Sequence, residues 1–260
     1  MIDTHTHLDG DEFVSDLDEV IARAQAAGVE KMFLPNVNEE TWPRISRLCE
    51  IYPQVLYPMI GLHPEDVDPT KRNITQVLDD MEALLEQGVP VIGIGEVGLD
   101  FYWDESYRQQ QLDAFERQIG WAVRYDLPLM IHARNAHREL VDMIGRHAAE
   151  GLRGVFHCFT GTVDEARQLL AFDGFKLGIG GVSTFKKSTL PAVLKEAVPL
   201  SRVVLETDSP YMAPVPHRGQ RNESAFVVEV ARKLAEVYDL SVEDIDRVTT
   251  ENALQLFAVS

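Results

Sequence analysis

The feature of this sequence that most constrains its fold is a repeated alternation of short apolar segments with longer segments of helical periodicity. The short segments recur at intervals of roughly 20–40 residues, a spacing that suits parallel strands joined by helical crossovers. We expect strands at residues 2–7, 29–34, 55–61, 91–97, 129–132, 155–158, 175–179 and 203–207. Eight such units predict an α/β fold of the closed (β/α)8 type, a TIM barrel. An open, doubly wound sheet is the alternative.

The segments between the expected strands carry apolar residues at helical spacing, as Val20, Ile21 and Ala24 illustrate. We expect helices at residues 11–27, 39–52, 74–86, 107–125, 136–149, 163–172, 190–197, 224–238 and 242–256. The chain of 260 residues contains no internal repeat, linker or low-complexity tract. We therefore expect a single barrel domain over residues 1–260.

Composition narrows the class of protein and its substrates. No apolar run approaches the roughly 18 residues of a membrane span, and the N-terminus has no basic region followed by an apolar core. Cys49 and Cys158 stand far apart, which is typical of a reduced, cytoplasmic protein without disulfides. A net charge of −18 repels polyanions, so a nucleic-acid substrate would need local basic groups or bound metal. No feature indicates an obligate protein partner.

Histidines and carboxylates stand where the predicted strands end. His5 and His7 are two residues apart, so a strand would aim both imidazoles toward one face. At the ends of the fourth, fifth, sixth and eighth predicted strands stand Glu96, His132, His157 and Asp208. A barrel gathers the carboxyl ends of its strands on one face, where active sites lie.

This set of residue types indicates a metal centre. Four imidazoles and two carboxylates exceed the ligands of one tetrahedral ion and suit two ions about 3.5–4 Å apart that share a carboxylate. Glu96 lies in an otherwise apolar segment, where a carboxylate without a cation is costly to bury. Glu206 and Asp208 share another short segment and again favour a cation. Each residue taken alone also has a structural interpretation, because a strand-end histidine often bonds only a backbone carbonyl.

Several motifs together resemble the signature blocks of the TatD family, metal-dependent deoxyribonucleases within the amidohydrolase-like barrels. They are DTHTHLD at residues 3–9, GLHP at 61–64, GEVGLDFY at 95–102, HCFTG at 157–161, LETDSP at 205–210 and PVPHRGQRNE at 214–223. The resemblance implies one ion held by His5, His7, Glu96 and Asp208, and a second held by Glu96, His132 and His157. Zinc, manganese and magnesium all remain open for these two divalent cations.

The resemblance also implies catalytic roles for Asp208, Glu96 and His63. Asp208 would position a water activated by the two ions and accept its proton. Glu96 would bridge the ions, and His63 would lie near the substrate. The reaction would be hydrolysis of phosphodiester bonds in DNA, single-stranded or at 3′ ends, in the 3′–5′ direction.

Expected substrate contacts lie on loops after the strands. Arg218 and Arg221 follow the eighth strand, where barrels often bind phosphate; a solvated loop is the alternative. We also count Glu206 and Tyr102 among the substrate contacts, and Tyr102 with Trp103 could stack on a base or simply cover the core. Two further pairs, Lys186 with Lys187 and Arg134 with Arg138, are placed to meet a backbone phosphate.

One departure from the family affects these contacts. Gln220 stands where the family usually carries a lysine, so affinity for phosphate or substrate preference could differ here. Two rival functions use the same site. The first is hydrolysis of a small amide, lactone or ester, although the fourth strand offers Glu96 and no lysine for a bridging carbamate. The second is metal binding without catalysis, against which six ligands at an open barrel mouth argue.

Overall fold

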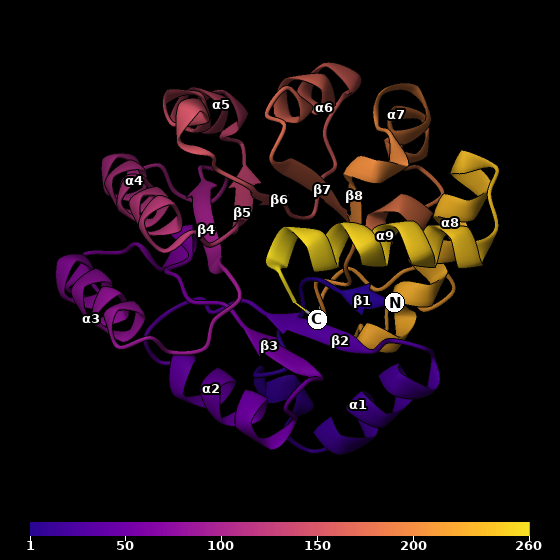
Figure 1. The fold of residues 1–260 in the computed structure, drawn as a ribbon, viewed down its shortest axis with the longest axis horizontal. Coiled ribbons are helices and arrows are strands. Elements are labelled where there is room, and N and C mark those ends of the chain that lie inside the picture. The colour runs from indigo at the N-terminus through magenta and orange to yellow at the C-terminus, as the bar shows by residue number, and fades with distance from the viewer. Residues whose placement is uncertain (260) are drawn as a thin grey trace.

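Eight parallel strands follow one another around a barrel in chain order, and helices surround them (Figure 1). The structure is a computed structural model and describes residues 1–259. The strands are β1 (Ile2–Asp3), β2 (Lys31–Leu34), β3 (Leu56–Pro58), β4 (Ile94–Asp100), β5 (Leu129–Arg134), β6 (Gly154–Phe156), β7 (Phe175–Ile179) and β8 (Val203–Leu205). Their continuous ladders form two parallel sheets, β1–β2–β3 and β4–β5–β6–β7–β8.

Two short contacts join these sheets and close the barrel. Between β3 and β4, Ile60 pairs with Ile94, and the amide of Gly95 donates to the carbonyl of Ile60 at 2.9 Å. Between β8 and β1, Thr6 pairs with Ser209. Closure confirms the predicted TIM barrel and excludes the open sheet.

The helices alternate with the strands, as the sequence predicts. The α-helices are α1 (Leu17–Ala26), α2 (Trp42–Ile51), α3 (Ile74–Glu86), α4 (Arg108–Tyr125), α5 (His137–Arg146), α6 (Val163–Leu170), α7 (Leu190–Ala197), α8 (Val227–Tyr238) and α9 (Val242–Phe257). Short 3-10 helices are η1 (Asp11–Phe13), η2 (Pro64–Asp66), η3 (Ala148–Glu150), η4 (Gly181–Thr184), η5 (Leu200–Arg202) and η6 (Ser224–Phe226).

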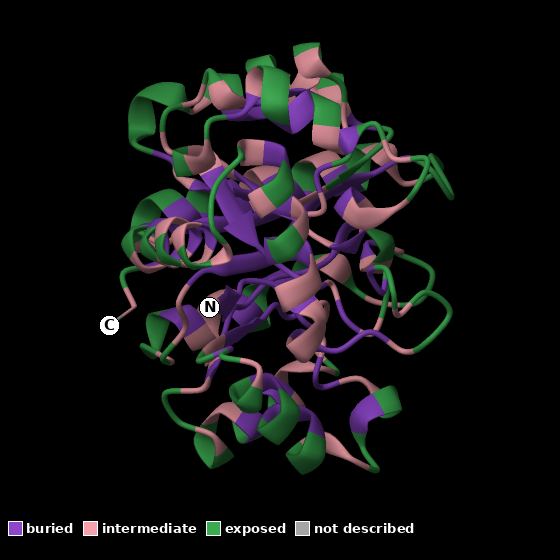
Figure 2. Cartoon of the chain, turned by 90° about the vertical axis from the view of Figure 1, so that its right-hand side faces the viewer, coloured by how far each residue is buried: buried purple, intermediate pink, exposed green. Residues whose placement is uncertain are grey.

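Side-chain caps explain where several helices begin. Thr162 and Glu165 form a capping box at α6, each satisfying the other's backbone amide. The side chains of Asn73 and Ser241 accept from the third residue of α3 and α9, respectively. Each helix then buries its apolar side against the barrel, so that the strands are buried and the outer helix faces are exposed (Figure 2).

A separate apolar cluster fills the end of the barrel at which the strands begin. The strands contribute Ile2, Phe33, Met130, Val155 and Val204, Met59 follows β3 directly, and α9 adds Ala253, Leu256 and Phe257. The side-chain amide of Asn252 donates to the carbonyl of Val203 at 2.8 Å, which fixes α9 across this end (Figure 1). The carboxyl ends of the strands are therefore the face left for a site. Within residues 1–259, no helix combines the length and apolarity needed to cross a membrane.

Two predicted strands differ most from the bounds in the structure. The strand expected at residues 2–7 ends at Asp3, because the chain then leaves the regular ladder and bonds to β2 and β8 alternately. The strand expected at residues 91–97 is β4, which starts at Ile94 and runs on to Asp100. This strand was predicted too early in the chain, because its last residues, Gly98 to Asp100, read as loop in the sequence.

Candidate metal centre

The segment that carries His5 and His7 lies between β2 and β8. The amide of His7 donates to the carbonyl of Ser209 at 2.8 Å, and the amide of Asp208 donates to the carbonyl of His5 at 2.9 Å. The two imidazoles converge, because their Nε2 atoms lie 3.1 Å apart. The paired arrangement expected of them is present, although both residues lie beyond the end of β1.

Glu96 stands at the centre of the site, with only 3% of its surface exposed. A register shift between Ile94 and Val97 bends β4 at this residue, as a β-bulge does. Oε2 of Glu96 lies 3.2 Å from His5 Nε2 and 3.5 Å from His7 Nε2. Oε1 lies 3.2, 3.0 and 2.9 Å from ring nitrogens of His63, His132 and His157.

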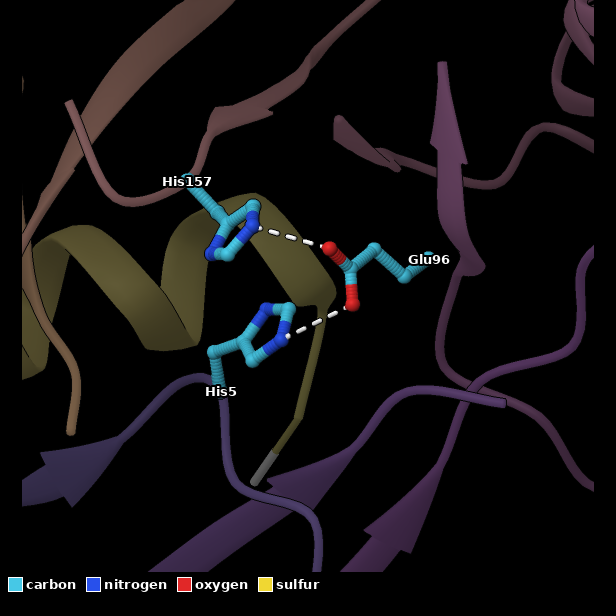
Figure 3. Close-up of side chains that lie close together, drawn as sticks. All are labelled: His5, Glu96 and His157. Atoms are coloured by element: carbon cyan, nitrogen blue, oxygen red, sulfur yellow. Dashed lines mark ion pairs between the residues drawn. The ribbon is translucent and has the colours of Figure 1, made fainter. Parts of the chain in front are cut away.

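The two oxygens of Glu96 therefore face different groups of imidazoles. Figure 3 shows His5 and His157 approaching opposite oxygens of the same carboxylate. A carboxylate that binds a different cation through each of its oxygens requires this division. The rings of His5 and His157 also stack, with centroids 4.0 Å apart, so the two groups adjoin.

Asp208 completes the group at Glu96 Oε2. Its Oδ1 lies 3.8 Å from His5 Nε2 and 3.7 Å from His7 Nε2. The backbone of Asp208 has a φ of 56°, a left-handed conformation in which aspartate and asparagine are enriched. Ligand atoms of His5, His7 and Asp208 lie within 4.8 Å of one another, so the structure brings together the first predicted ligand set.

The second predicted set is also assembled. Oε1 of Glu96, Nδ1 of His132 and Nε2 of His157 are mutual neighbours, and the two histidine nitrogens lie 3.4 Å apart. His63 adjoins this group but has a different chemistry. Its Nδ1 accepts a hydrogen bond from the amide of Glu65 at 3.1 Å, so in the neutral ring Nε2 carries the hydrogen. That tautomer suits a hydrogen-bond donor better than a metal ligand.

Two buried carboxylates stand behind the second group. Asp100 Oδ2 lies 2.8 Å from His132 Nε2, and Glu206 Oε1 lies 3.7 Å from His157 Nδ1. Glu206 is fully buried and accepts from the amide of Cys158. A side chain at Gly178 would place its Cβ 2.0 Å from Glu206 Oε2, so the glycine makes room for this carboxylate. Carboxylates in such positions fix the orientation of ligand imidazoles.

Asp100 is not among the site residues predicted from the sequence. The signal was available, since residues 96 and 100 share one face of a strand with a period of two. Glu206 was expected to contact substrate; that prediction is untested, and its carboxylate here faces His157.

Burial and mutual charge set the protonation of the site without metal. Burial alone would raise the pKa of Glu96, but His157, His63 and His5 hold it well below its usual range. Burial, reinforced by His157, lowers the pKa of His5 far below normal. His5 is therefore neutral, and one ring nitrogen has a lone pair to offer.

The pKa values of Asp208 and His132 shift in the opposite direction. Burial raises the pKa of Asp208 to about 6, against the pull of His157 and His7. Burial opposes protonation of His132, but Asp100 and Glu96 raise its pKa to about 9. The buried carboxylates and imidazoles of this site share a small number of protons. Divalent cations can bind the same oxygen and nitrogen atoms in place of those protons. Imidazole nitrogens and carboxylate oxygens fit zinc or manganese, and these residues therefore fit the divalent ions that the sequence predicts.

Comparison with known proteins identifies the family of this barrel. The model of the family described as "TatD related DNase" matches residues 2–258. The chain belongs to this TatD family. It is 36% identical to an uncharacterized metal-dependent hydrolase, YabD, of Bacillus subtilis, with all of both chains covered. It is 31% identical to a protein of Edwardsiella piscicida named 3′-5′ ssDNA/RNA exonuclease TatD, again with full coverage of both.

The structures agree as well. The crystal structure of the TatD homologue YjjV from Escherichia coli matches with a TM-score of 0.92 and 32% identity, covering 100% of this chain and 98% of the other. The resemblance recognised in the sequence is thus confirmed, and the chain is a TatD-type metal-dependent hydrolase.

The substrate contacts expected of this TatD protein have varied surroundings. Arg221 forms a two-armed ion pair with Asp16, at 2.8 and 2.7 Å, and lies over the ring of Phe13. Arg218 lies 3.8 Å from the ring centroid of Phe185 and makes one hydrogen bond, to the carbonyl of Ala213. Both contacts with phosphate stay predictions, and the structure leaves Arg218 the freer of the two.

Tyr102 and Gln220 lie on exposed loops of the carboxyl face, after β4 and β8. The guanidinium of Arg134 covers one face of the Tyr102 ring at 3.6 Å. The amide of Gln220 donates to the carbonyl of His217, and its side chain points to no described carboxylate or aromatic partner.

Proposed function

We propose that this TatD-family hydrolase cleaves phosphodiester bonds in single-stranded DNA, in the 3′–5′ direction, at a centre that holds two divalent cations. The observation that carries the proposal is the division of Glu96, whose two oxygens each face a separate imidazole group. A carboxylate that faces both groups can hold two ions at the roughly 3.5–4 Å separation found in two-metal phosphodiester hydrolases. The relative named as a 3′-5′ ssDNA/RNA exonuclease supports the substrate class and direction.

Basic side chains at the barrel mouth support an anionic substrate. Arg134 ends β5, Lys186 and Lys187 follow η4, and Arg218 lies on the loop after β8. Within residues 1–259, none of the four makes a salt bridge, whereas Arg117 on the outer helices pairs with two carboxylates. Unpaired cations gathered on one face of a chain with net charge −18 make the potential there locally favourable for phosphate.

The chain's own residues have defined tasks in this reaction. When bound, divalent ions would acidify a water and stabilise the charge that builds on the phosphorus oxygens. Asp208, with its pKa raised to about 6, would accept the proton of the attacking water at Oδ1. His63 would donate from Nε2 to a phosphate oxygen, since its Nδ1 is occupied by the amide of Glu65.

The test combines metal analysis with a nuclease assay on end-labelled oligonucleotides. We expect about two divalent ions per chain and stepwise shortening from the 3′ end of single strands, with slower attack on blunt duplexes. An anomalous map with one ion and no density near His132 and His157 would contradict the two-ion centre. Turnover of lactones or dihydroorotate without turnover of any phosphodiester would favour the rival amidohydrolase function.

A further inference from the structure

A cluster of three exposed side chains lies beside the metal centre, and two of them, Tyr102 and Trp103, have no role in the chemistry above. Trp103 is 69% exposed and Tyr102 is 49% exposed. Their rings pack edge to face, with centroids 4.8 Å apart. The guanidinium of Arg134 lies 3.6 Å from the centroid of Tyr102 and 5.3 Å from that of Trp103. We call these three residues the aromatic shelf.

The shelf is attached rigidly to the residues that hold His132. In the β4–β5 ladder, Gly98 is paired with His132 and Asp100 with Arg134. Arg134 therefore lies two residues beyond His132 on the same side of β5, about 6.6 Å further along the strand at 3.3 Å per residue. The amide of Tyr102 donates to Asp100 Oδ1 at 2.9 Å, and Asp100 also holds the His132 ring.

The exposure of Trp103 is unusual for a side chain fixed in this way. It is more exposed than any other large apolar residue of the described chain. Of the remaining tryptophans, Trp121 is buried and Trp42 is half-buried. An indole that contacts Tyr102 and Arg134 and is still 69% exposed leaves ring surface for stacking, whereas tryptophan and tyrosine usually bury their rings.

The charge beside the ring narrows what would stack there. Arg134 makes no salt bridge within residues 1–259 although carboxylates greatly outnumber basic groups in the chain. A planar cation next to an exposed indole suits a ligand that has a flat π-face and a phosphate a few bonds away from it. A nucleotide of an unpaired strand offers both, whereas a duplex hides the faces of its bases.

We propose that the aromatic shelf is a stacking site for one unpaired nucleobase of the strand whose phosphodiester lies at Glu96, with Arg134 on the neighbouring phosphate. The proposal rests on the proposed function and adds a base-recognising subsite to it. Tyr102 then supports Arg134 and Trp103, and the indole of Trp103 is the surface that touches the base.

The experiment is a double-mutant cycle in which the side chain of Trp103 and the bases of the strand are removed separately and together. The metal-loaded full chain is titrated with two fluorescent single strands of equal length, both capped by a 3′ phosphorothioate to slow turnover. One strand has normal bases and the other has abasic sites at its 3′-terminal positions. Binding is followed by anisotropy for the wild type, Trp103→Ala, Trp103→Phe and the control Leu240→Ala. Leu240 is an exposed apolar residue on the loop between α8 and α9.

We expect Trp103→Ala to weaken binding of the normal strand by about 5- to 150-fold, the range for loss of one base–aromatic stack. Trp103→Phe should restore most of this affinity, and Leu240→Ala should leave it unchanged. The abasic strand should bind the wild type weakly and lose little more with Trp103→Ala. Equal losses on both strands would overturn the proposal. A difference in oligomeric state between the wild type and Trp103→Ala on size exclusion would also overturn it, since the shelf would then be a contact between protein chains.

Failure of the proposed function gives a different result. If the chain hydrolyses no phosphodiester yet the binding cycle shows coupling between Trp103 and the base, the shelf stands and the reaction is wrong. If the chain shortens single strands but shows no coupling, the reaction stands and the shelf is wrong.

Discussion

Asp100 Oδ2 lies 2.8 Å from His132 Nε2, while the other nitrogen of the same ring, Nδ1, lies 3.0 Å from Glu96 Oε1. The first contact fixes a hydrogen on Nε2 in the neutral ring, and this leaves the lone pair of Nδ1 facing the metal centre. Asp100 is 2% exposed, so water does not compete for this hydrogen bond. The carboxylate therefore selects the tautomer and orientation of a proposed ligand without lying at the centre itself.

Asp100→Asn should weaken the second metal site while leaving the first intact. The amide can present its own N–H to His132 and favour the wrong tautomer, and loss of such a partner typically costs about 10–100-fold in metal affinity or activity. The measurement is metal titration by calorimetry beside turnover of a phosphodiester at limiting metal. Asp104→Asn, on the exposed loop after β4, is the matched control. Unchanged affinity for both ions would show that Asp100 has only a structural role.

Much of this site follows from the sequence because its residues stand near the ends of regularly alternating strands. The convergence of five of these residues can be predicted without knowledge of tertiary contacts, since barrel closure gathers strand ends. They are His5, His7, His132, His157 and Asp208. The predicted strand bounds are wrong where the backbone departs from a regular strand. Residues 4–7 leave the β1 ladder, and β4 starts at Ile94, three residues after its predicted start at residue 91.

Contacts between segments that are distant in the sequence cannot be predicted from its periodicity. Arg23 on α1 forms a two-armed ion pair with Glu223, which lies 200 residues later. Arg221 and Asp16 make a second such pair beside it. In the sequence, Arg221 is one basic residue in a loop with charged neighbours, and nothing marks its partner. Its predicted phosphate contact rested on the loop's position alone.

The two arginines of this loop should respond differently to truncation. Arg221 is committed to Asp16 and Phe13, so we expect Arg221→Ala to lower the melting temperature. It should reduce turnover of an oligonucleotide and of bis-p-nitrophenyl phosphate by similar factors, and Asp16→Ala should reproduce this loss. If turnover of the oligonucleotide fell much more than turnover of bis-p-nitrophenyl phosphate, the phosphate contact first predicted for Arg221 would be supported instead.

Arg218→Ala should instead act selectively on the longer substrate. The guanidinium makes a single backbone hydrogen bond and no salt bridge within residues 1–259, so it is available to a phosphate remote from the scissile bond. Turnover of the oligonucleotide should fall more than that of the small phosphodiester. The dependence of log affinity on log salt should lose about one unit of slope. An unchanged slope would remove Arg218 from the substrate path.

Asp208→Asn should nearly abolish turnover. An amide cannot accept a proton and binds cations poorly, and removal of a general base alone typically costs about 10²–10⁴ in rate. Asparagine is the informative substitution because it adopts the left-handed backbone of residue 208 as readily as aspartate, so the change removes charge and little else. Near-normal turnover with metal restored would exclude Asp208 from the proposed catalytic role.

The same substitution should have the opposite effect on the metal-free fold. Burial raises the pKa of Asp208 from 3.8 to about 6, and Glu96 and Glu206 add to this rise. Between those two pH values the folded chain binds more protons than the unfolded chain, so stability of the wild type falls as pH increases. Above pH 6 the full effect of the ionised carboxylate, up to about 3 kcal/mol, opposes folding.

Asp208→Asn removes this opposition, because an amide does not ionise. In excess chelator the variant should be as stable as the wild type near pH 4 and more stable by a constant amount above pH 6. Urea unfolding at a series of pH values measures this difference. The side chain of Asp208 makes no hydrogen bond in the described chain, and its ion pairs there are with His5 and His7, at 3.8 and 3.7 Å. A variant less stable than the wild type at pH 7.5 would therefore mean that the ionised carboxylate stabilises the fold through those imidazoles, against the direction of its pKa shift.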